Sequence, residues 1–164
     1  MNPTDWINKY SAGYSNSLRR QRIRRLSESL SKSGARGIAV LDVGGTLAYW
    51  EKWAGELPSG AVGRIDVVNL PVQVGKLAGT SRSICGVEVR FLAGNIIDGP
   101  CEGMAARYGL VHCSSVIEHV GDAGAQRAFA AAMRRLGDKL WVQTPAKEFP
   151  LEAHFRLPFS RGCL

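Results

Sequence analysis

Short apolar runs, separated by glycines, prolines and polar turns, recur along the chain and predict five β-strands. Each run has the length of a buried strand and stops at a turn residue, as where Gly44 follows the first run and Pro71 follows the second. Residues 71–86 show no firm pattern and are predicted to be a loop with at most a weak helix. The predicted strands cover residues 37–43, 64–70, 87–93, 110–114 and 139–143.

Apolar residues at three- and four-residue steps predict helices before and between these strands. Ile23, Leu26 and Leu30 give this spacing in the first helix, and Ser15 or Ser17 is the candidate for its N-terminal cap. The clearest helix lies late in the chain and carries four apolar residues on one face. The predicted helices cover residues 17–32, 48–57, 102–108 and 123–136.

Strands that alternate with helices or long connections favour an α/β fold, because parallel strands need crossover connections. We therefore expect a mostly parallel sheet of about five strands with helices on both faces. A length of 164 residues allows one such domain. Ligands of open parallel sheets bind beyond the carboxyl ends of the strands, where the strand order reverses. The candidate site residues are therefore those that directly follow a strand.

Charge divides the chain into two parts. The net charge is +7, of which residues 1–36 carry +6 and residues 37–164 carry +1. We predict a basic N-terminal helical segment over 1–36 and a nearly neutral domain over 37–164. The five arginines of residues 19–25 are also compatible with a nucleic-acid-binding module, because arginines bind phosphates. The alternative is a solvated helix face, and because such faces commonly carry this much charge, nucleic acid is the less favoured partner.

Several classes of protein are disfavoured by what the sequence lacks. No run approaches the roughly 18 apolar residues of a membrane span, and the first ten residues lack the apolar core of a signal peptide. These features predict a cytoplasmic protein without a membrane partner. The four cysteines have neither zinc-knuckle nor redox-dithiol spacing, which predicts free thiols and no metal site. They are Cys85, Cys101, Cys113 and Cys163.

Three segments at predicted strand ends resemble the motifs of one enzyme family. Asp42 lies at the end of the first strand, and Gly44 and Gly45 follow it. The third glycine of a dinucleotide loop and the Lys of a phosphate loop are absent, which disfavours a pyrophosphate cofactor. Glu118 and His119 follow the fourth strand, and the fifth is followed by Thr-Pro and a Phe-Pro segment. Together, over residues 37–159, these motifs resemble the class I S-adenosylmethionine-dependent methyltransferases of the type 11 kind, which have a Rossmann-like fold.

The resemblance implies a binding role for residues at each strand end. Asp42 would lie near the methionine part of S-adenosylmethionine, with Gly44 and Gly45 passing beneath the cofactor. Asn69 stands where the family has an acid that binds the ribose hydroxyls, so one charge-assisted hydrogen bond is lost. The remaining implied contacts are Asn95 and Ile96 at the adenine, with Asp98 as the alternative partner, and Cys113 and Ser114 beside the cofactor and the acceptor.

The catalytic residue is not identified by the sequence, and Glu118 and His119 are the candidates. A histidine beside the transfer site can accept a proton from a hydroxyl or amine. His154 is a second candidate, whereas His112, inside a strand, is predicted to be a packed core residue. Some relatives hold a metal with an extra acid before the Glu-His pair, but Ser115 occupies that position and leaves the set incomplete.

The predicted function is methyl transfer from S-adenosylmethionine to an unidentified small molecule by in-line displacement. Since the main task is to hold the reactants in line, no dedicated base is required. The alternatives are a non-catalytic or truncated protein that keeps the fold, and the nucleic-acid-binding module. The family also places the helix before the first strand over the pocket, where an arginine-rich helix would form a lid or recognise an acidic substrate.

The family sheet has two further strands at its C-terminal end, and residues 144–164 are too few to form a helix and a hairpin. A shortened product, a minimal member of the family or completion by a partner would each explain this. We expect the fifth predicted strand to present an open edge, which natural proteins seldom leave bare.

A homo-oligomer that covers this edge is therefore predicted, and poor solubility is the expected result if none forms. Light scattering on the purified chain should report a mass above that of the monomer. A monodisperse, thermally stable monomer would contradict the prediction.

Overall fold

Six strands form one sheet in the computed structural model, which describes the backbone of residues 3–144 and the side chains of residues 16–144. Every neighbouring pair of strands is parallel except β3 and β4. The strands are β1 (Ile38–Val43), β2 (Val62–Asn69), β3 (Ser81–Ile84), β4 (Val87–Ala93), β5 (Leu110–Ser114) and β6 (Leu140–Gln143). The predicted α/β fold with a mostly parallel, Rossmann-like sheet is confirmed.

The strand order β3-β4-β2-β1-β5-β6 places the point of reversal between β1 and β5. From β1 the chain adds β2 and β4 on one side, and it then returns to add β5 and β6 on the other. Asp42 pairs with His112 and Val43 with Cys113 in the β1–β5 register, so the two strands end at the same level. The crevice between their carboxyl ends is the place where such sheets bind ligands.

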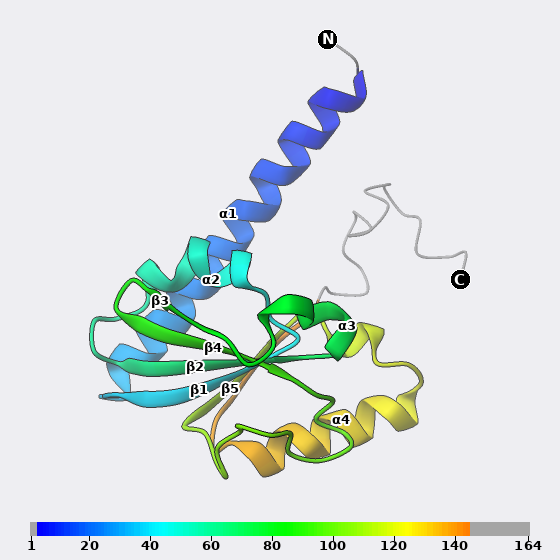
Figure 1. Cartoon of the computed structure of the whole chain (residues 1–164). Coiled ribbons are helices and arrows are strands. Elements are labelled where there is room, and N and C mark those ends of the chain that lie inside the picture. The colour runs from blue at the N-terminus through cyan, green and yellow to red at the C-terminus, as the bar shows by residue number, and fades with distance from the viewer. Residues whose placement is uncertain (1–2, 145–164) are drawn as a thin grey trace.

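Helices cover both faces of the sheet (Figure 1). Ile23, Leu26 and Leu30 of the first helix are buried in one apolar cluster with Trp50 and Trp53 of the second. The last helix buries its apolar face, including Phe129 and Met133, in a second cluster on the opposite face. The helices are α1 (Pro3–Lys32), α2 (Leu47–Trp53), α3 (Pro71–Val74) and α4 (Ala123–Leu136), with 3₁₀ turns at Ala54–Glu56, Gly75–Leu77 and Ile117–His119.

The first helix is longer than its apolar pattern predicted. It begins at Pro3, so the expected cap at Ser15 or Ser17 is wrong, and the helix passes through both serines. Figure 1 shows that its N-terminal half extends beyond the sheet. The apolar stripe marks only the part of α1 that packs on the sheet, which is why the pattern begins late. No helix within the described part of the chain is both long and apolar enough to cross a membrane.

Two further elements differ from expectation. The sequence pattern missed β3, because three of its four side chains are exposed and give no apolar signal. Cys85 and Gly86 join it to β4 with φ angles of 50° and 79°, the left-handed pair typical of a two-residue hairpin turn. The predicted helix over 102–108 is wrong, since this segment is irregular in the structure. Residues 71–86, predicted as a loop, contain α3, a 3₁₀ turn and β3.

Side-chain bonds to Asp66, rather than helical periodicity, hold the segment before β5. The Asp66 carboxylate is fully buried on β2 and receives two hydrogen bonds of 2.7 Å from Arg90. The Tyr108 hydroxyl donates to it at 2.8 Å, and Arg64 lies 3.1 Å away. Arg90 also donates to the Gly103 carbonyl at 2.9 Å. This network ties the segment before β5 to the sheet.

Replacing Arg90 tests how much this network contributes to the free energy of unfolding. We expect Arg90→Met to lower the free energy of unfolding by about 3 kcal/mol, because the buried Asp66 loses its bidentate partner. Arg82 is the matched control, since it is exposed on β3 and, among the described residues, its side chain donates only to the carbonyl of Ser81. Arg82→Met should change the value by less than about 0.5 kcal/mol. Urea unfolding of both variants measures the difference, and equal midpoints would contradict the assignment.

Candidate functional site

The carboxyl ends of β1, β2, β4 and β5 open onto two adjacent pockets that share Gly44. The first pocket lies toward β2 and β4, and the second lies toward α1 and α2. Because β1 stands at the point where the strand order reverses, both pockets occupy the position expected for a ligand of this fold.

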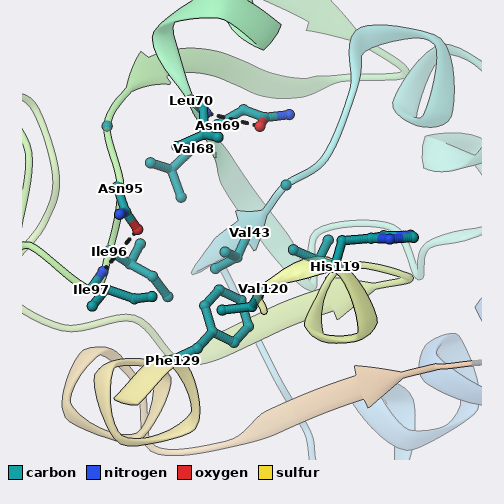
Figure 2. A pocket seen from close by; sticks show the side chains of 13 residues that line it. Val43, Val68, Asn69, Leu70, Asn95, Ile96, Ile97, His119, Val120 and Phe129 are labelled. Carbon is teal, nitrogen blue, oxygen red and sulfur yellow. Dashed lines mark hydrogen bonds between the residues drawn. The ribbon is translucent and has the colours of Figure 1, made fainter. Parts of the chain in front are cut away.

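The first pocket is an apolar cavity of about 270 Å³ with polar groups at its rim. Figure 2 shows Val43, Val68, Ile96, Val120 and Phe129 around this cavity. Val43 and Val68 lie at the ends of β1 and β2, Ile96 follows β4, Val120 follows the 3₁₀ turn Ile117–His119, and Phe129 belongs to α4. An apolar slot of this kind with a few polar groups is typical of a site for a flat, partly polar small molecule.

Two asparagine amides form the polar rim. Asn69, the last residue of β2, donates from Nδ2 to the Gly45 carbonyl at 3.2 Å and accepts from the Leu70 N–H at 2.9 Å. Asn95, just after β4, accepts from the Ile97 N–H at 3.2 Å (Figure 2). An amide has two N–H groups and two oxygen lone pairs, so both residues retain capacity for a ligand. Asp98, the alternative adenine partner, is exposed and does not line this pocket.

The glycine turn after β1 separates the two pockets. Gly44 has a φ of +73°, and a Cβ there would lie 2.5 Å from a methyl group of Val116. A Cβ on Gly45 would overlap the Asp42 carboxylate. Both glycines are therefore required for steric reasons, since the backbone passes directly over a buried side chain.

The Asp42 carboxylate is buried and both of its oxygens are bonded. The Trp50 indole N–H donates to Oδ2 at 2.7 Å, and the His112 Nδ1–H donates to Oδ1 at 2.7 Å. The residues come from β1, α2 and β5, and each is 1% exposed. His112 is thus a buried residue, as predicted, but it is also a hydrogen-bonding partner of Asp42. Its Nε2 is buried and has no hydrogen-bond partner among the described residues.

The second pocket is a cavity of about 340 Å³ beside the glycine turn. Its floor includes Asp42 and His112, and Tyr49 of α2 forms part of its wall. Thr46 caps α2 by accepting from the Tyr49 N–H at 3.3 Å, which fixes the direction in which this helix leaves the turn. Burial, followed by the charge of Asp42, raises the pKa of the Tyr49 hydroxyl above its ordinary value, so the phenol stays protonated.

Ser114 and Ser115, which end β5, also line the second pocket. The Ser114 hydroxyl donates to Gln143 Oε1 at a long 3.4 Å. Ser115 has a φ of 57°, a left-handed conformation that costs a non-glycine residue about 1–2 kcal/mol. Strained residues of this kind cluster at functional sites, where the surrounding structure holds them in place.

The candidate catalytic residues do not lie together. His119 is exposed at the rim of the first pocket, and its ring extends away from Phe129 in Figure 2. Glu118 lines neither pocket and instead accepts a hydrogen bond from Thr144 at 3.1 Å. His154 and the Phe-Pro segment lie outside the described residues. Within residues 16–144, no group of three or more His, Cys, Asp and Glu side chains is placed to hold a metal ion.

The predicted cofactor residues thus divide between two neighbouring pockets. The first contains Gly44, Asn69, Asn95 and Ile96, and the second contains Asp42, Gly44, Gly45 and Ser114. Their roles toward a cofactor stay predictions. Sequence reasoning did not find the bonds of Asp42 to His112 and Trp50. The bond between Asp42 and His112 follows from the register of β1 and β5, which places the two residues side by side.

Cys113, expected beside the cofactor, is fully buried and lines neither pocket. Burial, followed by the charges of Asp42 and Glu118, raises the pKa of its thiol to about 12. At pH 8 almost no thiolate is present, and the thiolate is the reactive form. Cys85, by contrast, is exposed in the β3–β4 turn.

Alkylation of the folded protein with iodoacetamide at pH 8 should therefore modify Cys85 and leave Cys113 intact. Peptide mass mapping after a short exposure reads both sites, and the same treatment in urea provides the fully reactive reference. Modification of Cys113 at the rate of Cys85 in the folded chain would contradict its placement.

Comparisons with known proteins find little similarity. No family model matches the chain, and no curated protein matches it. Among solved structures it is similar to the crystal structure of N-methyltransferase NodS from Bradyrhizobium japonicum WM9 in complex with S-adenosyl-L-homocysteine. The sequence identity is 19% and the TM-score is 0.45 over 69% of this chain. The chain spans about half the length of NodS, since the match covers 54% of that protein.

Proposed function

We propose that this chain binds S-adenosylmethionine across the two pockets and transfers its methyl group to a small-molecule acceptor. One observation carries the proposal. An apolar slot with two rim amides lies at the carboxyl ends of β1, β2 and β4, and a second pocket that contains Asp42, Tyr49 and Ser114 adjoins it at Gly44. The order of the sequence motifs supports the same family of reactions.

The chemistry of the first pocket fits an adenosine group. Val68, Ile96 and Phe129 offer apolar surface for the faces of a purine, and the Asn95 amide is the candidate for hydrogen bonds to its edge. Asn69 at the end of β2 is the candidate for the ribose hydroxyls. An amide in place of a carboxylate provides neutral rather than charge-assisted bonds, so we expect modest affinity.

The glycine turn fits the part of the cofactor that must pass close to the backbone. Since each oxygen of Asp42 already accepts a buried hydrogen bond, from Trp50 or from His112, we assign it a positioning role rather than a direct contact. It fixes the turn from below, and the Gly44 and Gly45 backbone then faces the cofactor. This assignment differs from the direct contact that the resemblance implies for the acid of this motif.

The bound cofactor would supply an activated methyl group on a sulfonium. The task of this chain is then to hold the acceptor in line and to exclude water, which supplies much of the rate of such transfers. Tyr49, Ser114 and Ser115 line the second pocket next to the glycine turn and are the candidates for orienting the acceptor. His119 at the rim of the first pocket remains the candidate base.

A second candidate function is binding of the cofactor without turnover. Asn69 favours it, because this residue keeps the pocket but weakens the contact to the ribose. Methylation of any acceptor by the purified chain would exclude this alternative.

Calorimetry with S-adenosylhomocysteine tests the proposal. We expect Asn69→Leu to weaken binding about tenfold, or ~1.4 kcal/mol, because it removes the rim amide and its bond to the Gly45 carbonyl. Gln73→Ala is the control, since Gln73 is exposed on α3 and lines neither pocket. Asp42 is unsuitable for this purpose, because its removal leaves buried donors on Trp50 and His112 unpaired. Absence of binding at millimolar ligand would overturn the proposal.

A further inference from the structure

Two cations stand at the mouth of the second pocket. Arg19 comes from α1, which crosses above the glycine turn, and Lys52 comes from the last turn of α2. Both are exposed, and both line the same cavity as Asp42, Gly45 and Ser114. The packing of α1 therefore places positive charge where the proposed function needs an acceptor.

The arginines of α1 differ in how their charge is balanced. Arg20 and Arg24 point to the other side of the helix and bind the two oxygens of Glu56 at 2.7 and 3.2 Å. These bonds lower the pKa of Glu56, as expected for a carboxylate held between two guanidinium groups. Arg19 makes no hydrogen bond or ion pair with the described residues, although it lies one position away in the sequence.

Neither cation of the second pocket forms an ion pair with an acidic residue of its described lining. Asp42 is the acidic residue among the described residues that line it, and Trp50 and His112 already occupy both of its oxygens. Lys52 Nζ donates to the neutral Asn16 amide at 2.9 Å and lies 5.2 Å from the centre of the Trp53 ring. A guanidinium and an ammonium at the mouth of a cavity form a site for a carboxylate or phosphate.

The walls of the pocket add a second requirement. Tyr49 and Trp53 line it together with the two cations and the glycine turn, and they provide aromatic surface. A ligand that reaches from Arg19 to the turn therefore has an apolar or aromatic body next to its charged group.

We propose that the second pocket binds the methyl acceptor and that this acceptor carries an anionic group, a carboxylate or phosphate, held by Arg19 and Lys52. The inference rests on the proposed function and adds the chemical class of the substrate. The acceptor body packs on Tyr49 and Trp53, which directs its reactive atom toward Gly44 and Gly45, where the two pockets meet.

A carboxylate could reach these cations from a second source, the amino-acid part of the cofactor itself. The two sources are separated by measuring S-adenosylhomocysteine, which has this carboxylate, and methylthioadenosine, which lacks it. If Arg19 holds the acceptor, Arg19→Gln and Lys52→Gln leave the affinities for both nucleosides within twofold of the unmodified chain. A selective loss of S-adenosylhomocysteine affinity assigns the cations to the cofactor and overturns the proposal.

Binding at the acceptor site is tested with benzoate and its neutral counterpart benzamide. The full chain is first saturated with S-adenosylhomocysteine, and binding is followed by NMR titration of the Trp53 indole N–H. We expect benzoate to bind more tightly than benzamide, and Arg19→Gln or Lys52→Gln to weaken benzoate about tenfold without affecting benzamide. Arg20→Gln is the matched control and should leave benzoate affinity unchanged, because Arg20 binds Glu56 outside the pocket. Thermal unfolding confirms that each variant is folded.

Equal affinity for benzoate and benzamide, or an equal effect of Arg19→Gln and Arg20→Gln, would overturn the inference while leaving the cofactor site intact. If S-adenosylhomocysteine itself fails to bind, the proposed function falls and the acceptor role falls with it. Benzoate and benzamide therefore test the acceptor inference, and S-adenosylhomocysteine tests the proposed function.

Discussion

The buried carboxylate of Asp42 is the interaction on which the site depends. It receives the Trp50 indole N–H and the His112 imidazole N–H at 2.7 Å each, and it thereby joins α2 and β5 to β1 at the reversal of the strand order. The glycine turn rests on this carboxylate with no space for a Cβ at Gly45. The two pockets lie on either side of that turn. Their shape therefore follows from one carboxylate that two side-chain donors hold inside the core.

Much of the fold could be predicted from the sequence, because the central strands β1, β2 and β5 are largely buried and read as short apolar runs. β1, β2, β4, β5 and β6 all fall close to the predicted ranges. β3 could not be found in this way, since three of its four side chains are exposed and its place follows from pairing with β4 across the Cys85–Gly86 turn. The segment before β5 failed for a related reason. The side chain of Asp66 on β2 holds it by accepting a hydrogen bond from Tyr108, which lies 42 residues later in the chain. No local sequence pattern shows such a bond.

The candidate site was predictable where residues directly follow a strand, and less so elsewhere. Gly44, Asn69, Asn95 and Ile96 line one cavity because their strands are neighbours in the sheet. The wall and mouth of the second pocket come from helices, and the angle at which α1 crosses the turn is set by the packing of Ile23, Leu26 and Leu30. The sequence shows that α1 is basic. The tertiary structure is needed to divide its arginines between Glu56 and the pocket.

The contact between Gly45 and the Asp42 carboxylate also constrains how this protein can change over generations. A side chain at position 45 is acceptable only after the carboxylate at position 42 has been lost or moved, because the two would occupy the same space. Loss of that carboxylate leaves Trp50 and His112 with buried donors and no acceptor, which is itself costly. Substitutions at these four positions are therefore expected to occur together, in lineages that have rebuilt the whole cluster, and not one at a time.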